Sequence, residues 1–188
     1  MWTGDAVGHC PHLLSAGMRL EGCRPVGAPE SRFVSYIPAV KRAPAFSMAA
    51  RPTRSGAIRL LESVDLPTSD LYDGHFRDFF FIGTATEPVG IVGLELHGEC
   101  ALLRSLAVTP SARAAGAGTA LVELAESHAR SHGVRNVYLL TTTAEDFFAR
   151  RGYARIGREA APDAIRSTRE FADICPAGSA FMVKHLPK

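Results

Sequence analysis

The absence of long apolar runs and of paired cysteines restricts the classes to which this 188-residue chain can belong. No stretch approaches the roughly 18 consecutive apolar residues of a membrane-spanning helix, so we expect no membrane partner. The N-terminal residues lack a basic segment followed by a sustained apolar run, which disfavours a secretory signal peptide. No two cysteines form a C-x-x-C pair, and we interpret all four as free thiols in a reducing compartment: Cys10, Cys23, Cys100 and Cys175. Together these absences favour a cytoplasmic protein.

An excess of charge of one sign is also missing. The 21 Lys and Arg residues nearly balance the 19 Asp and Glu residues, so the sequence offers no basis for a nucleic-acid partner. The composition, 46% hydrophobic and 21% charged, is typical of a soluble globular protein. The length suits one domain, alone or with an appendage.

Residues 1–54 differ in composition from residues 55–188, and we expect a poorly ordered extension followed by one folded domain. Prolines and scattered glycines interrupt every long periodic segment of the extension. Only residues 32–37 have the composition of a short strand. Four side chains of metal-binding type do not have the spacing of a standard zinc site, and we expect no metal there: His9, Cys10, His12 and Cys23.

Hydrophobic periodicity predicts strands and helices from residue 55 onwards. Ser55 is the expected N-cap of a first helix at residues 57–64, and a second short helix is expected after Asp70. We expect strands at 77–85, 89–97, 100–108, 136–140, 153–158 and 179–185, and helices at 119–132, 144–151 and 162–173. The first three strands predict an antiparallel meander. A helix joins the third strand to the fourth, so these two are expected to be parallel neighbours in a mixed α/β sheet.

A glycine-bearing loop joins the strand that ends at Val108 to the helix at 119–132. The loop contains Arg113-x-x-Gly116-x-Gly118, and such a loop at a helix N-terminus is suited to a phosphate group. A P-loop would require Gly-Lys-Ser/Thr, whereas this loop contains no lysine. A dinucleotide fingerprint would require G-x-G-x-x-G with an acidic residue about 20 positions later, and only G-x-G is present. An arginine with two glycines suits a pyrophosphate better, because the guanidinium binds one phosphate while backbone N–H groups surround the other.

Two motifs together resemble the N-acetyltransferases of the GNAT superfamily. Leu106-Ala107-Val108-x-Pro110-x-x-Arg113-x-x-Gly116-x-Gly118 is similar to that family's acetyl-coenzyme A signature, and Ala144-x-x-Phe147-Phe148-x-x-x-Gly152-Tyr153 resembles its second element. More narrowly, LLRSLAV, YLLTTTAEDFF and APDAIRSTREFADICP resemble the branch associated with bacterial arsenic-resistance genes. The resemblance covers about residues 57–188. It implies a mostly antiparallel sheet with a splayed central parallel pair and helices on both faces.

The same resemblance implies acetyl-coenzyme A as cosubstrate and no metal. Backbone groups of Leu106, Ala107 and Val108 would pair with the pantetheine amides, as an added strand pairs with a sheet edge. Thr141 and Phe147 would line the far side of the cofactor channel, although Phe147 also suits simple core packing. N–H groups of the loop would hold the pyrophosphate: those of Arg113, Ala114, Ala115, Gly116, Ala117, Gly118 and Thr119.

The catalytic groups that this family usually carries are missing. Phe148 occupies the position of the tyrosine acid, and Leu102 occupies that of the glutamate base. Glu95, on the neighbouring strand, is the candidate base, and Ser105 is the candidate donor to the leaving thiolate. The alternatives are an exposed strand carboxylate and a buried, hydrogen-bonded serine. Tyr153 is a further candidate acid.

Arg104 lies within an otherwise apolar strand and requires a partner if it is buried. An anionic group of a substrate suits its guanidinium, and the alternatives are an ion pair with Glu95 or Glu99 or an outward-facing side chain. We therefore expect acetyl transfer to the primary amine of a small, anionic molecule, and the branch resemblance implies an amino-acid-like arsenical. Because of Phe148 and Leu102, a non-catalytic acyl-coenzyme A-binding module is the alternative, with a nucleotide-binding protein third. A homodimer is left open.

Overall fold

The computed structural model describes residues 46–187. The strand expected at 32–37 and the histidines and cysteines near the N-terminus lie outside the described residues. The domain boundary between residues 54 and 55 stays a prediction. Within the described part, however, the sheet already includes β1 (Met48–Ala50), which lies before that boundary.

Seven strands form one sheet in the order β1-β2-β3-β4-β5-β7-β6. After β1 these are β2 (Phe79–Gly83), β3 (Pro88–His97), β4 (Cys100–Val108), β5 (Asn136–Thr141), β6 (Ala154–Ile156) and β7 (Ala180–His185). Only β4 and β5 pair in parallel among the described strands, from Cys100 opposite Asn136 to Leu103 opposite Leu139. The predicted mixed, mostly antiparallel sheet with a central parallel pair is therefore confirmed.

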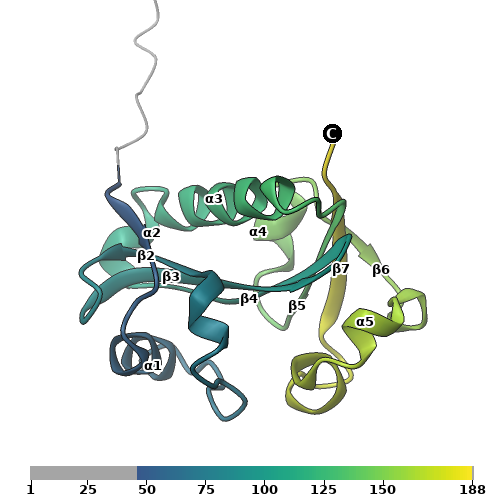
Figure 1. The fold of residues 1–188 in the computed structure, drawn as a ribbon, viewed down its shortest axis with the longest axis horizontal. Helices are drawn as coiled ribbons and strands as arrows, with labels where there is room; N and C mark the ends of the chain where they lie inside the picture. The colour runs from purple at the N-terminus through teal and green to yellow at the C-terminus, as the bar shows by residue number, and fades with distance from the viewer. Residues whose placement is uncertain (1–45, 188) are drawn as a thin grey trace, which may run out of the picture. The chain divides into compact units, whose positions relative to one another are not determined.

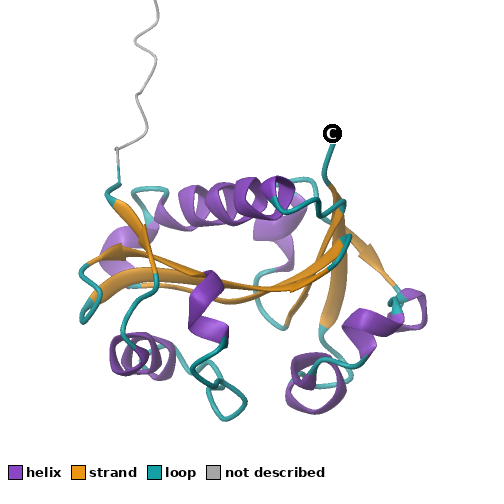
Figure 2. Cartoon of the chain, viewed as in Figure 1, coloured by secondary structure: helices purple, strands orange, loops and turns teal. Residues whose placement is uncertain are grey.

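Helices cover both faces of this sheet (Figures 1 and 2). α3 (Ala117–Ser131) and α4 (Glu145–Ala149) lie on one face, and α1 (Arg54–Glu62) and α5 (Asp163–Arg166) lie on the other. The shorter helical segments are α2 (Pro110–Arg113), η1 (His75–Asp78), η2 (Arg158–Ala160) and η3 (Glu170–Ile174). No helix among the described residues has both the length and the apolar character needed to cross a membrane.

Each covering helix buries one apolar face. α3 places residues at helical spacing against the sheet, and Leu121 and Ala125 are fully buried there. α1 packs Leu61 against Phe79, and α5 packs Ile165 against Leu102 and Phe181. Leu102 is therefore a core residue beneath α5, on the sheet face opposite α3.

Two details of the predicted helices were wrong. α1 begins at Arg54, because the hydroxyl of Thr53, not of Ser55, accepts the N–H of Gly56 at 3.1 Å. The helix expected at 162–173 is two short segments, α5 and the π-helical turn η3. The hydroxyls of Ser167 and Thr168 donate to carbonyls three residues earlier, and that of Thr168 also accepts the N–H of Phe171 at 3.3 Å. Such side-chain bonds compete with the helical pattern, so the chain turns between the two segments.

A substitution at Gly93 can test the close packing of the sheet against the core. A Cβ added at this residue of β3 would lie 2.2 Å from the ring of Phe79, which is fully buried. We expect Gly93→Ala to lower the free energy of unfolding by about 1–3 kcal/mol, because overpacking forces buried side chains to move. Denaturant-induced unfolding measures this change.

The matched control is Gly178→Ala, because a Cβ at that exposed glycine meets nothing within 4 Å. Its free energy of unfolding should stay within about 0.5 kcal/mol of that of the parent protein. Equal losses in the two variants would contradict the described packing of β3.

Candidate functional site

A β-bulge at Ser105 interrupts β4. Gly93 pairs with Arg104, and Ile91 pairs with Ala107, so the two residues Ser105 and Leu106 face Val92 alone. Ser105 has a φ of 53°, in the left-handed region that residues with a Cβ seldom adopt. A bulge of this kind bends its strand and ends regular pairing.

Beyond the bulge the parallel pair separates. The pairing of β4 with β5 ends at Leu103 and Leu139, whereas β5 continues beside β7 as far as Thr141. Ala107 and Val108 pair with β3 on one side, and Leu106–Val108 has no strand partner on the β5 side within residues 46–187. The bulge therefore leaves a short edge of backbone N–H and C=O groups facing a cleft.

Two adjoining cavities form this cleft, and they share Leu66, Leu106, Thr143 and Ala144. The bulge cavity, of about 370 Å³, lies between Leu103–Leu106 on β4 and the end of β5. The loop cavity, of about 580 Å³, extends along Leu106–Val108 to the glycine loop before α3. The bulge cavity takes its name from the bulge at Ser105, and the loop cavity takes its name from the loop that contains Gly116, Gly118 and Thr119.

The loop cavity ends at the N-terminus of α3. Gly116, with a φ of 84°, turns the chain into the helix, and the first intrahelical bond runs from Ala120 N–H to Gly116 C=O at 3.1 Å. By helix geometry, the N–H groups of residues 117–119 have no acceptor within the helix. Gly118 and Thr119 line the cavity, so this positive helix end faces an open space that suits an anion.

Only some of the loop residues that were predicted to bind the pyrophosphate line the loop cavity. Arg113 and Gly116 do so, and Arg113 Nε also donates to the carbonyl of Val108 at 2.9 Å. Ala114, Ala115 and Ala117 do not line the cavity. The N–H of Ala115 donates to Ala112 instead, and Ala117 is fully buried.

Two arginines that the sequence analysis did not identify also line the loop cavity. Arg150 and Arg151 follow α4, and both line the loop cavity. The guanidinium of Arg151 lies 3.4 Å from the ring centroid of Phe147 and donates to the hydroxyl of Thr119. Burial, together with the charge of Arg150, lowers the pKa of Arg151, so an anion in the cavity would be favoured. The Arg-Arg pair directly before Gly152 was the signal in the sequence.

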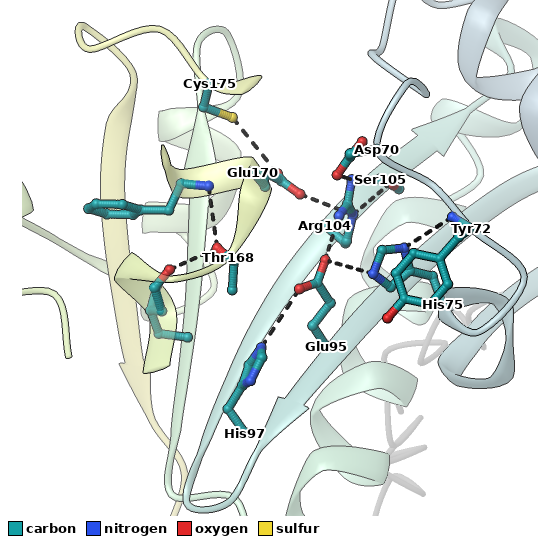
Figure 3. Close-up of polar contacts among 12 residues, drawn as sticks. Asp70, Tyr72, His75, Glu95, His97, Arg104, Ser105, Thr168, Glu170 and Cys175 are labelled. Atoms are coloured by element: carbon teal, nitrogen blue, oxygen red, sulfur yellow. Dashed lines mark hydrogen bonds and ion pairs between the residues drawn. The ribbon is translucent and has the colours of Figure 1, made fainter. Parts of the chain in front are cut away.

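Arg104, which lines the bulge cavity, is only 3% exposed, and carboxylates surround its guanidinium (Figure 3). Its Nη2 lies 2.6 Å from Asp70 Oδ2, its Nε lies 3.0 Å from Glu170 Oε2, and its Nη1 donates to Glu95. Burial acts to lower the pKa of Arg104, but the three carboxylates outweigh it and raise that pKa. The ion pair with Glu95, one of the alternatives from the sequence, is confirmed. Because all three nitrogen positions face carboxylates, this geometry does not favour direct binding of a substrate anion by Arg104.

The three carboxylates lie on two sides of the guanidinium. Glu170 lines the bulge cavity, whereas Asp70 and Glu95 line a separate cavity of about 200 Å³ that includes His75 and His97. The Nε2 atoms of these histidines lie 3.6 and 3.7 Å from the Glu95 carboxylate. Glu95, the predicted base, thus does not line the bulge cavity.

The carboxyl group of Glu170 has a raised pKa. Burial raises its pKa from 4.5 to about 7, and the charges of Glu95 and Asp70 add to this effect while Arg104 opposes it. The folded protein therefore binds a proton that the unfolded chain releases. By linkage, the contribution of Glu170 to stability is lost as the pH rises from about 4.5 to about 7.

Asp70, Glu95 and Glu170 also form the one group of three potential metal ligands found among residues 46–187. Their nearest oxygen atoms lie within 4.8 Å of one another. Because the guanidinium of Arg104 faces all three, it already supplies the positive charge that such a group requires.

The other predicted residues are placed as follows. Ser105 and Thr141 line the bulge cavity, and Phe147 lines the loop cavity while packing against the core. Phe148 is buried at the edge of the bulge cavity, against the ring of Tyr153. Tyr153 lines neither cavity, and burial beside Glu126 raises its pKa, so the structure does not favour it as an acid.

Comparison with known proteins assigns this architecture to a family. The model of the acetyltransferase (GNAT) family matches residues 50–157. An uncharacterized N-acetyltransferase of Chlorobaculum tepidum is 37% identical over 92 residues, which are 48% of this chain and 59% of that protein. An amino-acid acetyltransferase of Pseudomonas putida is 41% identical over 69 residues, which are 37% of this chain and 16% of that protein. The chain thus spans less than two thirds of each of these relatives.

Solved structures show the same fold. N-acetylglutamate synthase from Neisseria gonorrhoeae, complexed with coenzyme A and L-arginine, has a TM-score of 0.63 at 22% identity, covering 77% of this chain and 34% of that chain. Rv2747 from Mycobacterium tuberculosis, in complex with CoA and NLQ, has a TM-score of 0.60 at 22% identity, covering 74% and 99%. Identities this low establish likeness of fold alone.

Removing the guanidinium tests the buried ion cluster. We expect Arg104→Ala to lower the free energy of unfolding by about 3–5 kcal/mol at pH 8, because it leaves buried carboxylates without a counter-charge. The loss should shrink toward pH 5, because the pKa of Glu170 is raised to about 7 and this carboxyl is then protonated. Denaturant unfolding at the two pH values measures it.

Arg135→Ala is the control, since its pair with Glu99 is solvent-exposed, with side chains 54% and 66% exposed. We expect a change of less than about 1 kcal/mol. A loss in Arg104→Ala as small as that of the control would show that the buried cluster does not support the fold.

Proposed function

Because the chain belongs to the GNAT family of acetyltransferases, we propose that it transfers an acetyl group from acetyl-coenzyme A to a primary amine of a small molecule. One observation carries the proposal: the bulge at Ser105 leaves the edge of Leu106–Val108 unpaired, next to the N-terminus of α3. The strand edge suits the pantetheine arm of coenzyme A, and the positive helix end suits its pyrophosphate.

The loop cavity would hold the donor. Its strand edge offers N–H and C=O groups to the pantetheine amides, as in strand addition. The pyrophosphate would lie at Gly118 and Thr119, where N–H groups of α3 are free and Arg113 and Arg150 add positive charge. The structure of the Neisseria synthase contains bound coenzyme A, which supports this choice of donor.

The bulge cavity would hold the acceptor amine. It continues the loop cavity past Leu106, so a thioester at the junction would face Ser105 on one side and Thr141 on the other. Direct attack of the amine on the thioester carbonyl requires mainly that the two are held together. Ser105 is retained in this proposal as a donor to the leaving thiolate.

The charges of this cavity bear on the acceptor. The amino-acid acetyltransferase relative supports a small amine as the acceptor. An anionic acceptor, such as the arsenical that the branch resemblance implies, would require a cation. Arg104 is the one cation lining the bulge cavity among the described residues, and its nitrogen atoms face carboxylates. We therefore propose a primary amine and make no requirement for an anionic group on it.

A non-catalytic acyl-coenzyme A-binding module is the second candidate. It is favoured by Phe148, which places an aromatic ring without a hydroxyl beside the bulge cavity. It is also favoured by Leu102, which is buried beneath α5. A cytoplasmic location and a homodimer stay predictions under either candidate.

Calorimetry and thiol release test these candidates in sequence. We expect the protein to bind acetyl-coenzyme A, and to release free thiol with at least one member of a panel of amino acids, polyamines and simple amines. Binding without thiol release for every amine would favour the module. Failure to bind acetyl-coenzyme A would refute both.

Gly118→Val probes the place of binding. A Cβ at Gly118 would lie 3.3 Å from the Phe147 ring, and the rest of a valine side chain would project toward the cavity that Gly118 lines. We expect acetyl-coenzyme A affinity to fall at least about tenfold, which corresponds to about 1.4 kcal/mol. Gly178→Val, in open space outside the cleft, should bind as the parent protein does. Unchanged affinity in Gly118→Val would contradict the assignment of the loop cavity.

A further inference from the structure

We propose that Glu170 is the general base that takes the proton from the acceptor amine. This inference rests on the proposed function. It assigns the base to η3, near the C-terminal end of the chain, although the sequence favoured Glu95 on β3.

The position of Glu170 carries the inference. Among the three carboxylates around Arg104, Glu170 alone lines the bulge cavity, where the amine would lie. Its carboxylate is fixed from two directions: Oε2 lies 3.0 Å from Arg104 Nε, and Oε1 lies 3.9 Å from Cys175 Sγ (Figure 3). A side chain held in this way costs little further ordering when a substrate enters.

Other groups of the bulge cavity do not suit the role. Burial, with the charge of Glu170, raises the pKa of Cys175 to about 12, so its thiol holds its proton near neutral pH. Arg104 is a cation and cannot accept a proton. Asp65, the other carboxylate lining this cavity, is exposed on the loop after α1 and has no contact with the ion cluster.

The proton affinity of Glu170 also matches the task. A base works best when its pKa is close to the working pH, and that of Glu170 is raised to about 7. The charged and titratable groups that set this value come from several elements: Asp70 after α1, Glu95 on β3, Arg104 on β4 and Cys175 after η3. His75 and His97 contact Glu95 on its far side, and Arg158 adds positive charge near Cys175.

The proposed reaction forms one amide bond, breaks one thioester bond and liberates one proton. The ionised carboxylate of Glu170 removes one proton from the acceptor ammonium, which becomes a neutral amine. The amine nitrogen forms a bond to the thioester carbonyl carbon, and the C–S bond breaks with its electron pair leaving on sulfur. The thiolate accepts a hydrogen bond from Ser105 and takes the second proton from nitrogen, which yields the amide and coenzyme A. Glu170 then releases its proton to water, so one proton is liberated in each cycle.

Glu170→Gln tests the proposal, because glutamine keeps the size of the side chain and cannot take up the proton. We expect kcat to fall at least about 100-fold. The KM for acetyl-coenzyme A, and its affinity by calorimetry, should stay within about threefold. In the parent protein, kcat/KM should rise with pH through an inflection near 7, and this limb should be absent from the variant.

Asp70→Asn is the matched control. Asp70 is another buried carboxylate that contacts the guanidinium of Arg104, but it lines the cavity of His75 and His97 and not the bulge cavity. The variant should keep more than a tenth of the parent kcat and a pH inflection, which should move below 7 because the charge of Asp70 helps to raise the pKa of Glu170. If the two variants lose kcat equally, Glu170 serves only to neutralise Arg104 and the proposal is refuted. The same holds if Glu170→Gln keeps its kcat.

The pH profile of the parent protein decides the matter even if a variant fails to fold. An inflection near 7 that does not move between amines of different pKa supports Glu170, and its absence refutes the proposal. Absence of thiol release with every amine would instead refute the proposed function itself. The two failures are therefore distinguishable.

Discussion

Four segments meet at the buried guanidinium of Arg104: the loop after α1, the consecutive strands β3 and β4, and η3, which is distant in sequence. Taking a charge out of water costs several kcal/mol, so Arg104 can be buried only if carboxylates surround it. One guanidinium against three ionised carboxylates would leave an excess of negative charge. The raised pKa of Glu170 reduces this excess, because that carboxyl holds its proton until near neutral pH. The ion cluster thus binds the two flanks of the sheet together and creates a titratable group at the cleft.

The bulge at Ser105 opens the cleft that lies beside this ion cluster. The pairing of β4 with β5 ends at Leu103, directly before Arg104 and the bulge, so Leu103–Leu106 both places the charge cluster and opens the cleft beside it. On one side of Leu106 the cleft presents a strand edge and a helix N-terminus. On the other side it presents Glu170, Ser105 and Thr141. Donor binding and amine activation therefore depend on a single local distortion of the sheet.

Sequence reasoning found what is encoded locally. The strand at 100–108 has the bounds predicted for it, the parallel pair follows from the strand–helix–strand order, and the glycine loop lies at the start of α3. It missed what depends on distant contacts. Nothing near Arg104 in the chain indicates that Asp70 and Glu170 will approach it. The turn at Ser167 and Thr168, where hydroxyl groups replace helical bonding, concealed the position of Glu170 within an expected long helix. The bulge had no signal, because Ser105 is an ordinary strand residue in composition.

A crystal structure of the protein with bound acetyl-coenzyme A tests the central claim most directly. The account predicts that the pantetheine amides bond to the backbone of Leu106–Val108, with the pyrophosphate at Gly118 and Thr119. The thioester should lie beside Ser105, in the cleft that the bulge opens between β4 and β5. A cofactor bound elsewhere, or a β4 that pairs with β5 along its whole length in the complex, would contradict it.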